Sequence, residues 1–184
     1  IQGRITPYSI RIMTARKGTD SFTTSESFIS EEKHISLVNE IFNEFKSIDD
    51  KWEKQKEIRT EDLIGKENII NAKRMDGTST EIVSDGGIIF YDGKIVGVCE
   101  NKYQKDHRNA CQRACIYPLY FDIKPSQVFL SCTGEGYTFD TDRWGGGATG
   151  TMYDIMKVRG TFIILNPTEQ EFKQTLRDWF KQLL

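Results

Sequence analysis

The chain has 184 residues, which favours a single compact domain, and its formal net charge of −2 gives no overall sign of a nucleic-acid partner. Its 38% hydrophobic and 28% charged residues are typical of a soluble globular protein. No apolar run is long enough to span a membrane, and the first residues lack the layout of a signal peptide. We therefore expect a cytoplasmic protein without a membrane partner, in which any basic surface is local.

From Glu31 onward, apolar residues recur at steps of three and four, which predicts a helix to about Ile48. Ser30 is a suitable N-cap for that helix. Residues 1–30 show no steady period and are interpreted as an arm or loop. The lysine-rich stretch 50–62 is interpreted as solvated helix or loop.

Residues 81–91 and 94–100 are typical of two strands joined by a tight turn at Asp92-Gly93. A helix is predicted over 107–121, with Leu119 among its apolar members and Pro118 in its last turn.

Two further strands are predicted, over 127–132 and 158–165, before a terminal helix. Thr168 and Glu171 form a capping box for that helix. Its apolar stripe is Phe172, Leu176, Phe180 and Leu183. The order hairpin, helix, strand, helix, strand, helix predicts an α/β fold with a mixed central sheet and helices on both faces.

The four cysteines, at positions 99, 111, 115 and 132, form no C-x-x-C pair and have no histidine at ligand spacing. Cys111 and Cys115 could share one face of a helix, but a closed zinc site needs four ligands. The cysteines are therefore expected to be reduced and packed as small apolar groups.

The strand predicted over 94–100 ends at two residues of opposite charge, Glu100 and Lys102. Glu100 and Lys102 point to one side of the strand and Asn101 to the other. The same E-x-K spacing occurs in three helix-like surroundings, but only the copy at 100–102 closes a strand that looks buried on both faces.

Asp85 precedes Gly86 and Gly87, and the hairpin would bring it beside Glu100. Two carboxylates and a lysine at a sheet edge suit Mg²⁺ and phosphodiester hydrolysis, with Lys102 positioning water or stabilising charge on the phosphate. The alternatives are that Asp85 is a turn residue and that Glu100 and Lys102 form an exposed ion pair.

The segment 102–113 carries four basic residues against Asp106 alone. Asn109, Gln112 and Arg113 are of the types that read base edges in the major groove. A helix starting near Arg108 would also favour phosphate at its N-terminus. An ordinary solvated helix start remains the alternative.

Together, SDGGII, CENKYQKD and RNACQRA resemble the core of the EcoRI-like type II restriction endonucleases, within the PD-(D/E)xK nuclease superfamily. The resemblance covers residues from about 65 to the end. It implies a restriction-endonuclease-like core over 65–184. Within the single domain, 1–184, that the length favours, residues 1–64 are interpreted as an N-terminal arm and helices.

The resemblance also implies specific roles. Asp85 and Glu100 would bind Mg²⁺ together with the backbone carbonyl of Asn101, and Lys102 would be the catalytic lysine. The residues on the family's base-reading or DNA-contacting positions are Arg108, Asn109, Ala110, Gln112 and Arg113. Family members are homodimers that cut palindromic double-stranded DNA, often with an AATT core, and need no small-molecule cofactor.

Three features depart from the family pattern. Ser84 replaces a proline, and Gln112 replaces a glutamate that accepts hydrogen bonds from adenine. Only six residues separate Lys102 from Asn109, where EcoRI carries a long arm. The loop 134–150 lacks a P-loop ending, and Arg143 in it is either a phosphate contact or part of a plain surface loop.

The resulting hypothesis is a homodimeric, Mg²⁺-dependent, sequence-specific DNA endonuclease of a bacterial restriction system. The alternatives are a repair or junction-resolving nuclease on the same fold, and a DNA-binding module that has lost cleavage.

Overall fold

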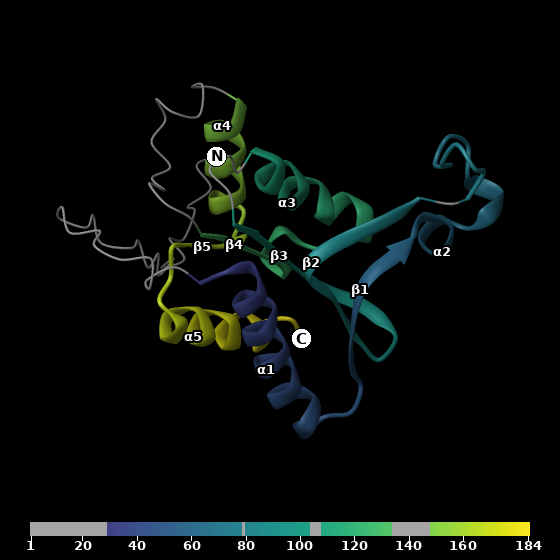
Figure 1. Cartoon of the computed structure of the whole chain (residues 1–184). Coiled ribbons are helices and arrows are strands. Elements are labelled where there is room, and N and C mark those ends of the chain that lie inside the picture. The colour runs from purple at the N-terminus through teal and green to yellow at the C-terminus, as the bar shows by residue number, and fades with distance from the viewer. Residues whose placement is uncertain (1–28, 79, 104–107, 134–147) are drawn as a thin grey trace, which may run out of the picture.

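The computed structural model describes residues 29–78, 80–103, 108–133 and 148–184 (Figure 1). Its centre is one five-stranded sheet in the order β1-β2-β3-β4-β5. The first three strands pair antiparallel, and β3-β4 and β4-β5 pair parallel. The strands are β1 Trp52–Arg59, β2 Glu81–Tyr91, β3 Lys94–Tyr103, β4 Val128–Thr133 and β5 Phe162–Leu165. The predicted mixed α/β sheet is confirmed.

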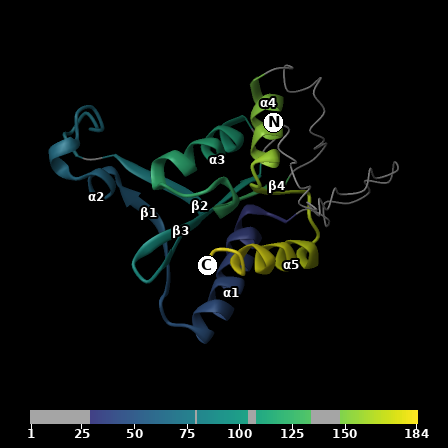
Figure 2. The same cartoon turned by 180° about the vertical axis from the view of Figure 1, so that it is seen from behind.

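Helices cover both faces of this sheet, as Figure 1 and the reverse view in Figure 2 show. The five α-helices are α1 Glu31–Ile48, α2 Thr60–Ile64, α3 Arg108–Phe121, α4 Ala148–Val158 and α5 Glu169–Phe180. Two short 3-10 helices, Lys66–Asn68 and Pro125–Gln127, complete the described elements. We call the side with α1 and α5 the α1/α5 face and the side with α3 and α4 the α3/α4 face. None of the helices in the described ranges is both long and apolar enough to cross a membrane.

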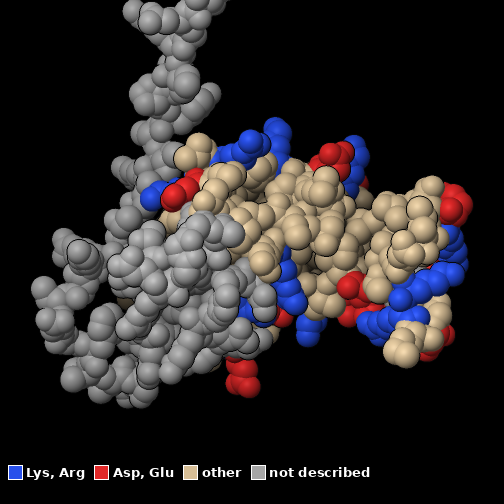
Figure 3. Space-filling view, turned by 90° about the horizontal axis from the view of Figure 1, so that it is seen from above, with Lys and Arg blue, Asp and Glu red and all other residues tan. Residues whose placement is uncertain are grey.

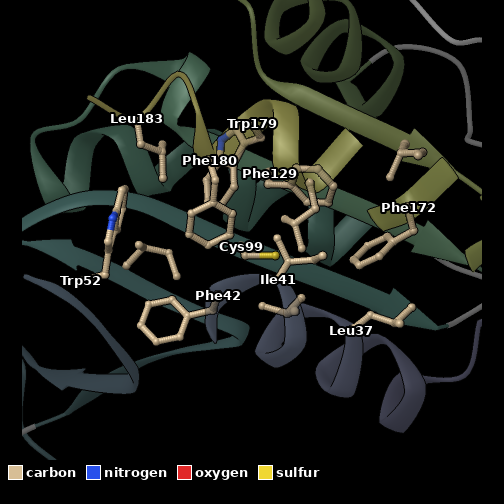
Figure 4. Packing of buried hydrophobic residues seen from close by; sticks show 14 of the residues in the cluster. Leu37, Ile41, Phe42, Trp52, Cys99, Phe129, Phe172, Trp179, Phe180 and Leu183 are labelled. Atoms are coloured by element: carbon tan, nitrogen blue, oxygen red, sulfur yellow. The ribbon is translucent and has the colours of Figure 1, made fainter. Parts of the chain in front are cut away.

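The α1/α5 face is closed by a dense aromatic cluster (Figure 4). Trp179 of α5 is fully buried, with its ring centroid 5.5 Å from that of Phe129 and 5.1 Å from that of Phe180. The capping box of Thr168 and Glu171 is present, so α5 begins as the sequence predicts. Apolar burial on this scale is the main source of folding free energy.

A second cluster fills the α3/α4 face. It combines β-strand residues such as Val98 and Leu130 with Cys111, Ala114 and Tyr117 from the inner side of α3. Adjacent residues of β3 therefore belong to different cores, which confirms that this strand is covered on both faces.

Several sequence predictions need correction. The stretch 50–62, predicted as solvated helix or loop, contains all of β1 and the start of α2, because β2 offers it an antiparallel partner. Residue 158 ends α4, and the last strand begins only at Phe162. By contrast, the predicted helix end at 121 is confirmed, with Pro118 inside α3.

Two apolar residues also lie outside the cores that the helical periods assigned to them. Leu119 of α3 is 82% exposed and Ile48, at the end of α1, is 84% exposed. All four cysteines are free, and only Cys115 is not fully buried, as expected for small reduced side chains.

Candidate active site

The site is built where β2 and β3 pair as a hairpin. A Cβ atom on Gly86 would lie 2.5 Å from the carbonyl oxygen of Cys99, so only glycine allows the two strands to approach this closely. Gly87 has a φ of 106°, in the region that favours glycine. The two glycines after Asp85 therefore fit a close backbone approach that brings this aspartate against β3.

Glu100 is fully buried on the α3/α4 face and surrounded by donors. The hydroxyl of Tyr117 donates to its Oε2 at 2.7 Å, and Ser84 Oγ lies 3.2 Å from the same oxygen. Arg113 donates to the other oxygen, Oε1, at 3.3 Å. A buried carboxylate needs such partners to remain charged, and both oxygens of Glu100 have them.

Burial raises the pKa of Glu100, and the neighbouring Asp85 raises it further. The hydrogen bond from Tyr117 and the charges of Arg113 and Lys102 lower the pKa and oppose these effects. Burial likewise raises the pKa of Tyr117, which keeps its hydroxyl protonated as a donor. A carboxylate with a raised pKa in a sheltered position is typical of functional sites.

Lys102 and Asp85 form the second pair. Lys102 Nζ lies 3.3 Å from Asp85 Oδ2, and both side chains keep about a fifth of their surface exposed. The structure thus brings Asp85, Glu100 and Lys102 together, as the hairpin argument predicts. Among the described residues, Asp85 is paired with Lys102 and Glu100 with Arg113.

Asn101 lies between Glu100 and Lys102 in β3, and its side chain points to the α1/α5 face. It is fully buried, and neither its side-chain nitrogen nor its side-chain oxygen has a hydrogen-bond partner among the residues that the structure describes. Ser131, opposite it on β4, is buried in the same state. The amide of Asn101 is therefore outside the carboxylate cluster, and a role for its backbone carbonyl as a metal ligand stays a prediction.

The predicted DNA-contacting residues lie at the start of α3. Arg108, Asn109 and Ala110 form its first turn, and their side chains lie outside the described residues. Gln112 is exposed, and Arg113 is 47% exposed although its guanidinium reaches Glu100. Arg143 and the loop 134–147 lie outside the described residues as well.

The donor set decides which metal fits. The described residues contain no group of three or more His, Cys, Asp or Glu side chains placed to hold a metal ion. Asp85 and Glu100 supply two carboxylates, which suit Mg²⁺, an ion that commonly binds through one or two carboxylates, waters and substrate phosphate. The oxygen of Glu100 that does not contact Tyr117 or Ser84 is paired with Arg113 in this structure, so a metal ion bound there would lie beside the guanidinium.

Sequence reasoning missed two residues of the site. The sequence marks Ser84 only as a replacement of a family proline, whereas its hydroxyl contacts Glu100 and the carbonyl of Cys99. Tyr117 is the second such residue. The signal for Tyr117 was its place four residues after Arg113, which puts a phenol one helical turn further on, over the buried end of β3.

No family model, curated protein or solved structure matches the chain at a significant level.

Proposed function

We propose that the protein is a Mg²⁺-dependent, sequence-specific double-stranded DNA endonuclease of the type II restriction kind, acting in the bacterial cytoplasm at a short palindromic site. The observation that carries the proposal is the convergence of Asp85, Glu100 and Lys102 from two paired strands, directly beside α3. The proposal also rests on the resemblance of these segments to the EcoRI-like enzymes and their restriction-endonuclease-like core.

The three residues would divide the chemistry among them. Asp85 and Glu100 would hold Mg²⁺, which supplies Lewis-acid stabilisation of the phosphate and of the departing oxygen. Lys102, whose Nζ lies 3.3 Å from Asp85, would orient the attacking water or stabilise the charge that develops on the phosphate. Tyr117 and Ser84 fix the buried oxygen of Glu100, so that its orientation does not change during the reaction.

The exposed side of α3 would recognise the DNA sequence. Helical spacing puts Asn109, Gln112 and Arg113 on one side of the helix, and Gln112 and Arg113 are accessible. Amide and guanidinium groups of this kind read base edges in the major groove. Arg108 and Ala110 would add contacts in the first turn, where helix N-termini also favour phosphate.

The second half of α3 supports a homodimer. From Ala114 to Phe121 the helix carries no charge, and Ile116, Leu119 and Tyr120 are exposed on its outer side. Figure 3, which looks down on this side, shows a broad uncharged area between charged patches. An uncharged surface can meet its own copy without like-charge repulsion, and a twofold dimer would present the same α3 to each half of a palindrome.

The proposal is tested by incubating the protein with a long, sequenced DNA in Mg²⁺ or in a chelator. We expect discrete fragments with Mg²⁺ only, and Lys102→Ala should lower the cleavage rate by about a thousandfold, because charge on the phosphate loses its stabilising cation. The matched control is Lys173→Ala, which also alters an E-x-K lysine but one paired with Glu40 and Glu169 on the α1/α5 face. It should cut like the unchanged protein.

Other outcomes would redirect the proposal. Nicking that follows DNA structure without a fixed fragment pattern would indicate a repair or junction-resolving nuclease. Tight binding to particular DNA without cleavage would indicate a binding module. Full activity of Lys102→Ala, with the near-UV circular dichroism of the folded protein retained, would rule out the mechanism.

A further inference from the structure

Arg113 connects the two halves of the proposed function, because it extends from the recognition side of α3 to a carboxylate of the candidate metal site. We propose that Arg113 is an interlock: its ion pair with Glu100 closes the metal site, and its transfer to DNA opens that site. This inference rests on the proposed function and adds how it is regulated. The site of Asp85 and Glu100 binds a metal ion tightly only when Arg113 contacts the DNA sequence that it recognises.

The two oxygens of Glu100 are held in different ways. Oε2 faces Tyr117 and Ser84, and both contacts are buried within the fold. Oε1 faces Arg113, the one partner of Glu100 among the described residues whose side chain is about half exposed. Oε1 is therefore the oxygen that can bind a metal without breaking buried hydrogen bonds, and the positive charge of Arg113 lies against it.

The long side chain of Arg113 also allows the exchange. Its stem leaves α3 beside the exposed Gln112, so a rotation of its side chain can carry the guanidinium from Glu100 toward a bound duplex. Guanidinium groups bind a guanine edge or a phosphate in a bidentate way.

The exchange leaves no charge without a partner. Within the described part of the chain, Asp85 with Lys102 and Glu100 with Arg113 form a neutral group of four. When Arg113 moves to DNA, the carboxylates gain a divalent cation and Arg113 gains a base or phosphate. Metal binding without DNA instead places a divalent cation beside Arg113 or breaks its ion pair with no new partner, and both are unfavourable.

The first test uses metal binding without DNA, at pH 8 and 0.15 M salt, where distant charges are screened. Tb³⁺, a luminescent ion that prefers oxygen ligands, serves as the probe, and Tyr117, whose hydroxyl lies 2.7 Å from Glu100, is a nearby sensitiser. We expect Arg113→Ala to bind Tb³⁺ about five- to tenfold more tightly than the unchanged protein, the range of one exposed to half-buried ion pair. Ca²⁺ titration by calorimetry provides an independent measurement.

Two further variants make the result specific. Gln112→Ala alters the neighbouring proposed base contact but touches no carboxylate of the site, so its Tb³⁺ affinity should stay unchanged. Glu100→Gln should lose the sensitised signal both alone and combined with Arg113→Ala. Thermal melting confirms that each variant is folded.

A second measurement uses saturating duplex that carries the site obtained by sequencing the ends of the cleavage fragments. Such DNA should raise the Ca²⁺ affinity of the unchanged protein and leave that of Arg113→Ala nearly unaltered, because the coupling between the two ligands runs through this side chain.

The outcomes separate the two proposals. Equal or weaker Tb³⁺ binding by folded Arg113→Ala would overturn the interlock while leaving the endonuclease intact. Tb³⁺ binding that persists in Glu100→Gln would instead remove the metal site on which the proposed function depends.

Discussion

The two faces of the sheet use the same strand for opposite purposes. On the α1/α5 face, Cys99 of β3 lies in the aromatic cluster around Trp179. On the α3/α4 face, the next residue, Glu100, is just as buried but carries a carboxylate with three side-chain donors. Because neighbouring residues of a strand point to opposite sides, stability and chemistry can be assigned to separate faces one residue apart.

The two faces also differ in whether their buried polar side chains are hydrogen-bonded. Within the described ranges, the buried side-chain atoms without a hydrogen-bond partner belong to His34, Asn101, Ser131, Thr161 and Trp179. Of these residues, His34 and Trp179 belong to α1 and α5. On the α3/α4 face, by contrast, Glu100 and Tyr117 contact each other. The buried carboxylate of Glu100 has hydrogen-bond donors, which stabilise its negative charge. Such a network indicates a site in which the charged form is needed.

Truncating one leucine on each face tests whether the two faces contribute differently to stability. Leu176 of α5 is fully buried in the α1/α5 cluster, so Leu176→Ala should lower the free energy of unfolding by about 3 kcal/mol through lost burial and a cavity. Leu119→Ala makes the same change on α3, where the side chain is 82% exposed, and should alter stability by less than about 0.5 kcal/mol. Urea denaturation measures both.

If Leu119→Ala were as destabilising as Leu176→Ala, the outer side of α3 would be part of a core and not a free surface. The Tb³⁺ affinity of folded Leu176→Ala should match that of the unchanged protein, since the α1/α5 face contributes no carboxylate to the site.

The hairpin and the meeting of Asp85 with Lys102 could be predicted because they depend on local rules. The Asp92-Gly93 turn sets the pairing of β2 with β3, and alternation along β3 sets the direction of Glu100. The cap at Thr168 is equally local. Each of these features needs only residues that are close in sequence or directly paired.

The features that sequence could not provide depend on distant partners. Residues 52–59 show no strand period, and they form β1 because the edge of β2 is open to them. The position of Tyr117 over Glu100 depends on how α3 lies across the sheet, 17 residues away along the chain. Leu119 fits a helical stripe, but the stripe is wide enough to include an outer face.

The pH dependence of stability provides a test of one buried polar group of the α1/α5 face, the imidazole of His34. Burial lowers the pKa of His34 to about 3, and its ring packs edge-on against Phe172 at 4.7 Å. In the unfolded chain the imidazole takes up a proton below its ordinary pKa of about 6.5, whereas the folded protein excludes that proton until about pH 3. The stability that this group contributes is therefore complete above pH 6.5 and is lost as the pH falls.

Between pH 7 and pH 5 the free energy of unfolding should decrease by about 2 kcal/mol through this residue alone. His34→Leu removes the titration, so the difference between the variant and the unchanged protein across this pH range isolates the contribution. Parallel pH profiles of the two proteins would show that His34 titrates normally and is not held in the apolar cluster.

The smallest expected effect concerns the outer surface of α3, where a second copy is proposed to bind. Leu119→Glu places a charge on this uncharged surface, and in a twofold dimer each charge would meet its own copy, so the dimer should dissociate at least tenfold more readily. Ile48→Glu is the matched control, since Ile48 is 84% exposed at the end of α1, on the opposite side of the sheet. Sedimentation equilibrium compares the two variants. A monomer at all concentrations, or equal weakening by Ile48→Glu, would separate this surface from dimer formation and leave α3 with its inner contacts alone.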